Sequence, residues 1–121
     1  MAINLIQKNG VTIAEVTGEE SSIRGMQTII DLIGEISFSY GCDRILVDRA
    51  LIDESFFDLR SGFAGELTQK FSNYSMKLAV TGDFSMFESL ALKAFLYESN
   101  LGKTVRFISD RMKAIDWLSK V

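Results

Sequence analysis

The sequence contains no histidine among its 121 residues. Without imidazole the chain cannot form a Ser–His or Cys–His nucleophile pair, and it offers no histidine metal ligand. A zinc site is therefore not expected, and we predict neither a bound metal nor a cofactor. Any catalysis would have to use carboxylates, lysine, arginine, tyrosine or hydroxyl groups, with or without a hard cation such as Mg²⁺.

Cysteine and long apolar segments are also scarce. Cys42 is the only cysteine, so it cannot form an internal disulfide and we expect a reduced thiol. No apolar run approaches the roughly 20 residues that cross a bilayer. The N-terminal stretch MAINLIQKNG lacks the apolar centre of a signal peptide. The sequence therefore predicts a cytoplasmic protein that does not contact membranes.

Basic residues are too few and too dispersed for a nucleic-acid surface. The chain has 13 lysines and arginines against 16 acidic residues, which gives a net charge of -3. Affinity for nucleic acid comes mainly from clustered lysine and arginine. We therefore expect no nucleic-acid partner.

The residues that are present favour one core of ordinary size, because 47% of the chain is apolar and nine residues are Phe. Residues 1–121 are predicted to form a single domain, without proline-rich linkers or repeats. Asn9 and Gly10 separate two β-like stretches, which indicates a hairpin. From Ser22 to about Gly41 apolar residues recur at helical spacing, which predicts an amphipathic helix.

The remaining pattern alternates strands and helices. Continuous apolar runs at 45–47 and 76–80 are typical of parallel strands covered on both faces, and a shorter strand follows at 105–108. Ser85 and Glu88 have the spacing of a capping box for the third helix, and Ser109 or Asp110 is placed to cap the last. The predicted fold class is α/β with the order ββαβαβαβα and a mostly parallel sheet flanked by helices.

The segment 45–71 carries the clearest indication of a site: a strand runs into an acidic loop and then a helix with Ser61 in its first turn and Asp58 as its cap. In open α/β sheets, binding groups lie beyond the carboxyl ends of the strands. We therefore assign candidate binding residues to the loops after the third and fourth strands. They are Asp48, Arg49, Phe56, Phe57, Asp58, Arg60, Ser61, Gly62, Gly82, Asp83 and Phe84.

The charged members of this set allow two interpretations. Asp48, Asp58 and Asp83, with the loop acids Asp53 and Glu54, are placed to form a magnesium or phosphoryl site. The simpler interpretation makes them helix caps, turn residues and exposed loop acids, and we favour it. Arg49 and Arg60 would bind an anion or pair with the loop acids, and pairing is the favoured prediction. Phe56 and Phe57 either anchor a partner or pack under the loop.

The hairpin, the βα units and Ser61–Gly62 at the second helix resemble STAS, or SpoIIAA-like, domains. In STAS anti-sigma antagonists the serine before this glycine is phosphorylated by a partner kinase, so the resemblance implies a phosphorylation candidate at Ser61. The usual motif has Asp two residues before the serine, where this chain has Leu59, with Asp58 one residue farther back.

The chain also resembles a family of short uncharacterised bacterial proteins through the runs FFDLRSGFAGELTQKF, LAVTGDFS and FLYESNLGK. That resemblance implies no activity. Our first functional hypothesis is a non-catalytic regulatory or binding module that recognises a protein partner or a small ligand. The alternative is a small enzyme for a phosphorylated or anionic substrate, with Asp48, Asp83, Arg49 and Arg60 around Ser61. A homodimer through the open edge of the hairpin is a further expectation.

Overall fold

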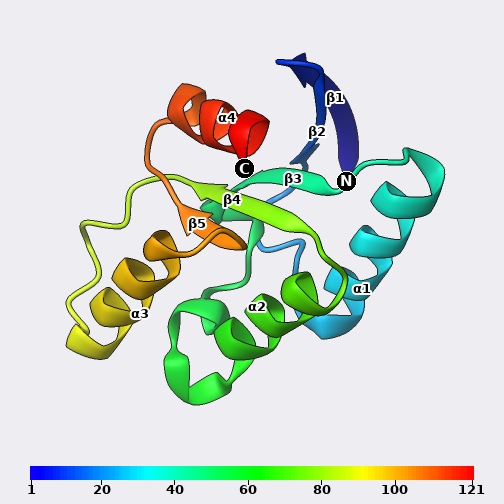
Figure 1. Ribbon diagram of the computed structural model, residues 1–121. Helices are drawn as coiled ribbons and strands as arrows, with labels where there is room; N and C mark the ends of the chain where they lie inside the picture. The colour runs from blue at the N-terminus through cyan, green and yellow to red at the C-terminus, as the bar shows by residue number, and fades with distance from the viewer.

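The computed structural model describes residues 1–121 and contains one five-stranded sheet in the order β1-β2-β3-β4-β5 (Figure 1). The first two strands pair antiparallel and all others pair parallel. The predicted α/β class with a mostly parallel sheet is confirmed. The strands are β1 (Ala2–Lys8), β2 (Val11–Thr17), β3 (Arg44–Asp48), β4 (Lys77–Thr81) and β5 (Val105–Phe107).

The predicted hairpin is present. Lys8 pairs with Val11, which leaves Asn9 and Gly10 as a two-residue connection. Their φ angles of 53° and 75° are both positive, as a type I′ turn requires. Asparagine tolerates this conformation and glycine adopts it freely, so the local sequence sets the register of the two strands.

Four helices cover the sheet unequally. Because the strands lie side by side in chain order, successive right-handed crossovers place α1 (Met26–Gly34), α2 (Phe63–Asn73) and α3 (Leu90–Leu101) on one face. The last helix, α4 (Arg111–Lys120), packs on the opposite face (Figure 1). The sheet is thus a middle layer with three helices on one side and one on the other.

The core follows the alternation of side chains along the central strands. Ile45 and Val47 of β3 belong to the larger cluster, which lies under α1, α2 and α3. Leu46, between them, belongs to the smaller cluster with Ile115 and Leu118 of α4. Successive side chains of a strand point to opposite faces. The continuous apolar run therefore reflects burial on both sides, as predicted.

The first helix begins later than the sequence predicts. It starts at Met26, and the preceding residues extend along the loop after β3. The amide nitrogen of Ile23 donates to the carbonyl oxygen of Leu51 at 2.8 Å, and that of Asp53 donates to the carbonyl oxygen of Ile23 at 2.8 Å. These bonds hold Ile23 in extended conformation, which is incompatible with the helix predicted from Ser22. A short π-helical segment, Glu35–Ser39, continues α1 toward Gly41.

The third helix also begins later. Ser85 does not cap it, because its amide and hydroxyl groups donate to the Asp83 carboxylate at 2.9 and 2.6 Å. Ser89 is the cap and accepts from the amide nitrogen of Leu92 at 3.2 Å. The predicted capping box is therefore wrong, and residues 83–88 form a loop. Asp110 caps α4 as predicted and accepts from Met112 and Lys113.

The structure also bears on the single cysteine and on the absence of membrane-spanning segments. Cys42 is buried and free, and its thiol donates to backbone oxygens of Thr12 and Arg44. None of the helices has the length and apolar character needed to cross a membrane.

The free edge of β5 is closed by α3. In a parallel pair alternate residues bond to the neighbouring strand, so the backbone groups of Val105 and Phe107 face away from β4. The side chain of Asn100 donates to the carbonyl oxygen of Phe107 at 3.0 Å and accepts from its amide nitrogen at 2.7 Å. The Ser99 hydroxyl donates to the Val105 oxygen at 2.5 Å. These contacts occupy the outward-facing oxygens of Val105 and Phe107 and the Phe107 amide nitrogen, three of the groups that an added strand would need.

We predict that Asn100→Ala lowers the free energy of unfolding by about 1–2 kcal/mol, because two partly buried backbone groups lose their partners. Urea denaturation measures the change. Ser72→Ala, at an exposed position of α2, is the matched control and should be nearly neutral. Equal stability of the two variants would contradict the assignment of Asn100 as the closure of this edge.

Candidate functional site

Three loops meet beyond the carboxyl ends of the parallel strands. The loop after β2 joins the loop after β3 through the Ser21 amide nitrogen, which donates to the Ala50 oxygen at 2.8 Å. The loop after β3 joins the loop after β4 through Arg49, whose guanidinium donates to the backbone oxygen of Asp83. The strand order does not reverse, so the sheet lacks the crevice that forms at a switch point. Any site here is therefore built by the loops.

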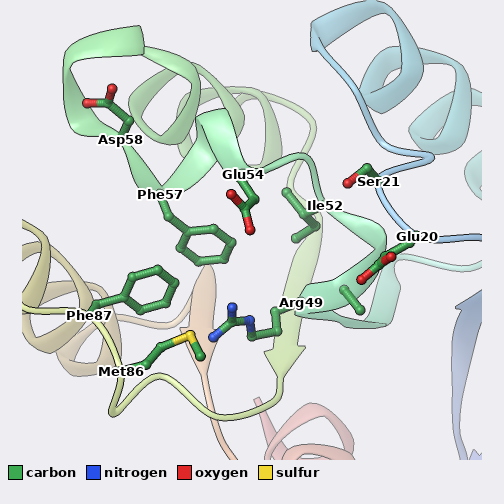
Figure 2. A pocket seen from close by; sticks show the side chains of 10 residues that line it. Glu20, Ser21, Arg49, Ile52, Glu54, Phe57, Asp58, Met86 and Phe87 are labelled. Carbon is green, nitrogen blue, oxygen red and sulfur yellow. The ribbon is translucent and has the colours of Figure 1, made fainter.

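The three loops enclose a cavity of about 300 Å³, which we call the loop pocket. This volume is at the lower end of the range for small-molecule sites. Figure 2 shows most of its lining side chains converging from separate segments of the chain, whereas the Asp58 carboxylate points away from the others. They are Glu20, Ser21, Arg49, Ala50, Ile52, Glu54, Phe57, Asp58, Met86 and Phe87.

One wall of the loop pocket is aromatic. Phe57 and Phe87 stack with ring centroids 4.9 Å apart and an interplanar angle of 18°. Phe56 meets Phe57 edge-on from the core side, with centroids 4.9 Å apart. Phe56 is 0% exposed and Phe57 is 9% exposed. The two aromatic residues thus have separate positions: Phe56 supports the wall from within, whereas Phe57 forms part of it.

Arg49 lies against this wall. Its guanidinium carbon is 4.8 Å from the centroid of Phe87 and 5.6 Å from that of Phe57, within cation–π range. The favoured pairing of Arg49 with a loop carboxylate is wrong, because the guanidinium bonds to the backbone of Asp83. Arg49 consequently connects the loops after β3 and β4 and carries a positive charge at the pocket wall.

Gly82 makes room for Arg49. A Cβ atom at position 82 would lie 2.5 Å from Cγ and 2.9 Å from Cδ of Arg49, far inside van der Waals contact. The φ angle of Gly82 is also +130°, a conformation that other residues rarely adopt. Gly82 therefore does not line the pocket but permits its central side chain to lie across the turn.

The carboxylates at the site form a mostly acidic rim. Asp58 pairs with Arg60 at 3.0 Å, which confirms the predicted pairing for that arginine. Hydrogen bonds from the Arg60 side chain and backbone lower the pKa of Asp58. Glu20 and Glu54 also line the pocket, and neither forms an ion pair within the chain. Because Arg60 pairs with Asp58, the lining is left with two unpaired carboxylates and one guanidinium, an excess of negative charge.

Three aspartates cap the single turns of 3-10 helix between β3 and α2. Asp48 precedes the turn Arg49–Leu51, Asp53 precedes Glu54–Phe57, and Asp58 precedes Leu59–Ser61. Each carboxylate accepts from the backbone nitrogen two residues ahead, as Asx turns do. The long acidic loop is therefore ordered by local hydrogen bonds, in agreement with the simpler interpretation of its acids.

No group of three or more acidic or cysteine side chains is arranged to hold a metal ion. Asp48 instead receives a long 3.5 Å hydrogen bond from Thr81, and Asp83 binds Ser85 within its own loop. The hydrogen bonds from Ser85 lower the pKa of Asp83, and those from Ser55 lower that of Asp53. The aspartates of the predicted magnesium or phosphoryl site thus lie in separate turns.

Ser61 is exposed but does not line the loop pocket. It lies in the last 3-10 turn, and Gly62, with φ of +78°, separates it from α2, which begins at Phe63. The prediction that Asp58 caps this helix and that Ser61 lies in its first turn is therefore wrong: α2 begins four residues later than an Asp58 cap implies, and its N-cap is Gly62. The Ser61 hydroxyl donates to the Ser55 oxygen at 2.5 Å and accepts from the Phe63 nitrogen at 3.2 Å.

The structure divides the predicted site residues into two groups. Arg49, Phe57 and Asp58 line the loop pocket. Phe84 is partly buried beside Phe57, with centroids 6.4 Å apart, and supports the wall. The other predicted residues lie in the surrounding turns or the core and do not line the cavity: Asp48, Phe56, Arg60, Ser61, Gly62, Gly82 and Asp83.

Sequence reasoning missed Glu20, Ser21, Ala50 and Ile52 as lining residues. For Met86 and Phe87 it left two interpretations open, an exposed apolar rim or burial in the core, and the structure places both in the pocket lining. The loop after β2 also follows a strand that pairs parallel, so the position of sites beyond parallel strands is the signal that points to Glu20 and Ser21. Phe87 was predicted to lie on a helix face, because the helix start was placed too early.

Comparison with protein families gives a match over nearly the whole chain. The sequence pattern of a family described as a domain of unknown function, DUF4180, matches residues 8–118. The chain belongs to the DUF4180 family. The matched region contains every residue of the loop pocket. No curated protein matches the chain.

For this DUF4180 domain we predict that Gly82→Ala destabilises the fold by about 2–4 kcal/mol, through backbone strain and the clash with Arg49. The matched comparison is Gly82→Ala in an Arg49→Ala background, where the strain remains and the clash is absent. A double-mutant cycle from urea denaturation should show a smaller cost in that background. Strict additivity would contradict the packing of Arg49 on Gly82.

Proposed function

We propose that this DUF4180 domain is a non-catalytic regulatory module that binds a small molecule in the loop pocket. The observation that carries the proposal is the convergence of three loops around a cavity of about 300 Å³ with a stacked aromatic wall. Pockets that combine apolar walls with a few polar groups are the usual form of small-molecule sites.

The charges support a ligand that carries an amine or another cationic group. Glu20 and Glu54 have no ion-pair partner in the chain, so they are free to pair with a cation. Arg49 is covered by the faces of Phe57 and Phe87. The stacked rings offer an apolar part of the ligand a surface to pack on. A small amine with an apolar body fits this combination.

The same charges weigh against the enzyme that acts on an anionic substrate. An anion entering the loop pocket would meet more carboxylates than guanidinium groups. A general acid at neutral pH also needs a raised pKa, whereas the shifts at Asp58 and Asp83 are downward. These observations favour binding over proton transfer.

We further propose a STAS-like mode of regulation at Ser61, based on the leading hairpin and the Ser61–Gly62 pair. The hydroxyl of Ser61 holds the carbonyl oxygen of Ser55, and Ser55 lies in the same 3-10 turn as Glu54 and Phe57 of the pocket. A phosphate group has only acceptor oxygens when fully ionised, so it would repel that carbonyl. Phosphorylation would then release a wall of the pocket and weaken ligand binding.

We predict that small amines with an apolar body raise the melting temperature at neutral pH, whereas matched carboxylates and phosphates do not, because Glu20 and Glu54 attract cations. Differential scanning fluorimetry with matched compounds measures the shift. Glu54→Gln should weaken binding about tenfold, as loss of a charged hydrogen bond does. Glu35→Gln, at an exposed residue outside the pocket, is the control.

Native mass spectrometry of protein purified from its own cells provides an independent test, since a tightly bound molecule is retained. Stabilisation by phosphates, with no response to amines, would reject the binding proposal and favour the enzyme.

For Ser61 we predict that protein from its own cells carries a phosphate there, which intact-mass and peptide analysis detect. Phosphorylated protein should exchange backbone hydrogens faster over residues 54–58, because the bond to Ser55 is lost. Ser61→Ala should abolish the modification, and Ser72→Ala should retain it. Unchanged exchange in the phosphorylated form would refute the link between Ser61 and the pocket wall.

A further inference from the structure

Helix α3 is apolar on two opposite sides. Leu92 and Leu96 face the sheet and are buried. On the outer side, Leu90 is 81% exposed, Tyr97 is 68% exposed and Leu101 is 67% exposed. Ala94 lies between them and is also exposed. We call Leu90, Ala94, Tyr97 and Leu101 the outer stripe.

The outer stripe has the spacing of a coiled-coil seam. Its members follow one another at intervals of four, three and four residues, which corresponds to d, a, d and a positions of a heptad. A single face of α3 therefore presents all four side chains to solvent in a row. This is the arrangement by which one helix packs against another of the same kind.

Two charged residues flank the outer stripe and indicate the partner. Lys93 and Glu98 occupy the g and e positions, one on each side of the stripe, and neither forms an ion pair within the chain. In a parallel pair of helices a g residue lies opposite the e residue five positions ahead in the partner. Lys93 of one copy then meets Glu98 of the other, twice across the two-fold axis. Antiparallel pairing would bring like charges together.

We infer that a second copy of this chain binds the outer stripe, with the two α3 helices parallel. The opposite charges are complementary only in that orientation, and the interface is isologous, as a two-fold dimer requires. Asn100 and Ser99 occupy three of the outward-facing backbone groups of β5, so this edge does not favour addition of a strand. The inference is independent of the loop pocket.

The area of the outer stripe sets the strength of the dimer. The four side chains expose an apolar surface on the order of a few hundred Å². This is the size of the largest apolar patch on a typical monomer. Stable complexes usually bury about 800 Å² per partner. The dimer is therefore weak and concentration-dependent, and it forms only where the chain is abundant or held together by other means.

Sedimentation velocity over a concentration series of the full chain tests the inference. The wild-type chain should associate reversibly. Lys93→Glu and Glu98→Lys should each weaken association about tenfold, because two attractive contacts become repulsive. The double variant restores the opposite charges and should return to wild-type association. Both positions are exposed, so the variants should fold normally, which circular dichroism verifies.

Disulfide cross-linking tests separately whether the two α3 helices are parallel. In a parallel pair in register, the two copies of residue 94 lie side by side, so Ala94→Cys should form an intermolecular disulfide on mild oxidation. Ala91→Cys, also exposed on α3 but outside the stripe, is the matched control and should form less. The inference would be overturned if the chain stayed monomeric at every concentration, or if neither Lys93→Glu nor Glu98→Lys changed the dimer affinity. Weakening by Leu5→Lys alone would assign the dimer to the β1 edge instead.

Discussion

Arg49 is the contact on which the arrangement of this site depends. It leaves the end of β3, crosses the turn where Gly82 has no side chain, and bonds to the backbone beyond β4. Its charged end lies against the rings of Phe57 and Phe87. The two loops are thereby held together by packing, one hydrogen bond and cation–π contact. The aromatic wall of the pocket follows from this one side chain, because both rings come from the loops that Arg49 joins.

The order of the strands explains why loops, rather than the sheet, form the cavity. A sheet that adds each strand beside the last never opens a crevice between diverging crossovers. In this DUF4180 domain the long β3–α2 segment occupies that place and is ordered by three aspartate-capped turns. Acidic residues that resemble a catalytic group in the sequence are therefore mainly structural. The pocket carboxylates without an ion-pair partner in the chain are Glu20 and Glu54.

Regular elements were predictable because their signals are local. The Asn9–Gly10 turn, the apolar runs of β3 and β4 and the Asp110 cap all lie where expected. The starts of α1 and α3 were wrong where tertiary contacts override local preference. Ile23 bonds to the loop after β3 and cannot join a helix. Ser85 binds Asp83 more readily than it caps α3, which leaves Met86 and Phe87 free to reach the pocket.

The sequence alone determined the α/β class, the order of strands and helices, and the exclusion of imidazole chemistry, because periodicity and composition need no distant partner. Only the tertiary structure decided which loop residues face one another. Glu20, Arg49, Glu54 and Phe87 are separated along the chain, and their meeting depends on strand order and on the space above Gly82. It also decided that one apolar side of α3 faces solvent, since a helix pattern shows two apolar sides without telling which one the sheet covers.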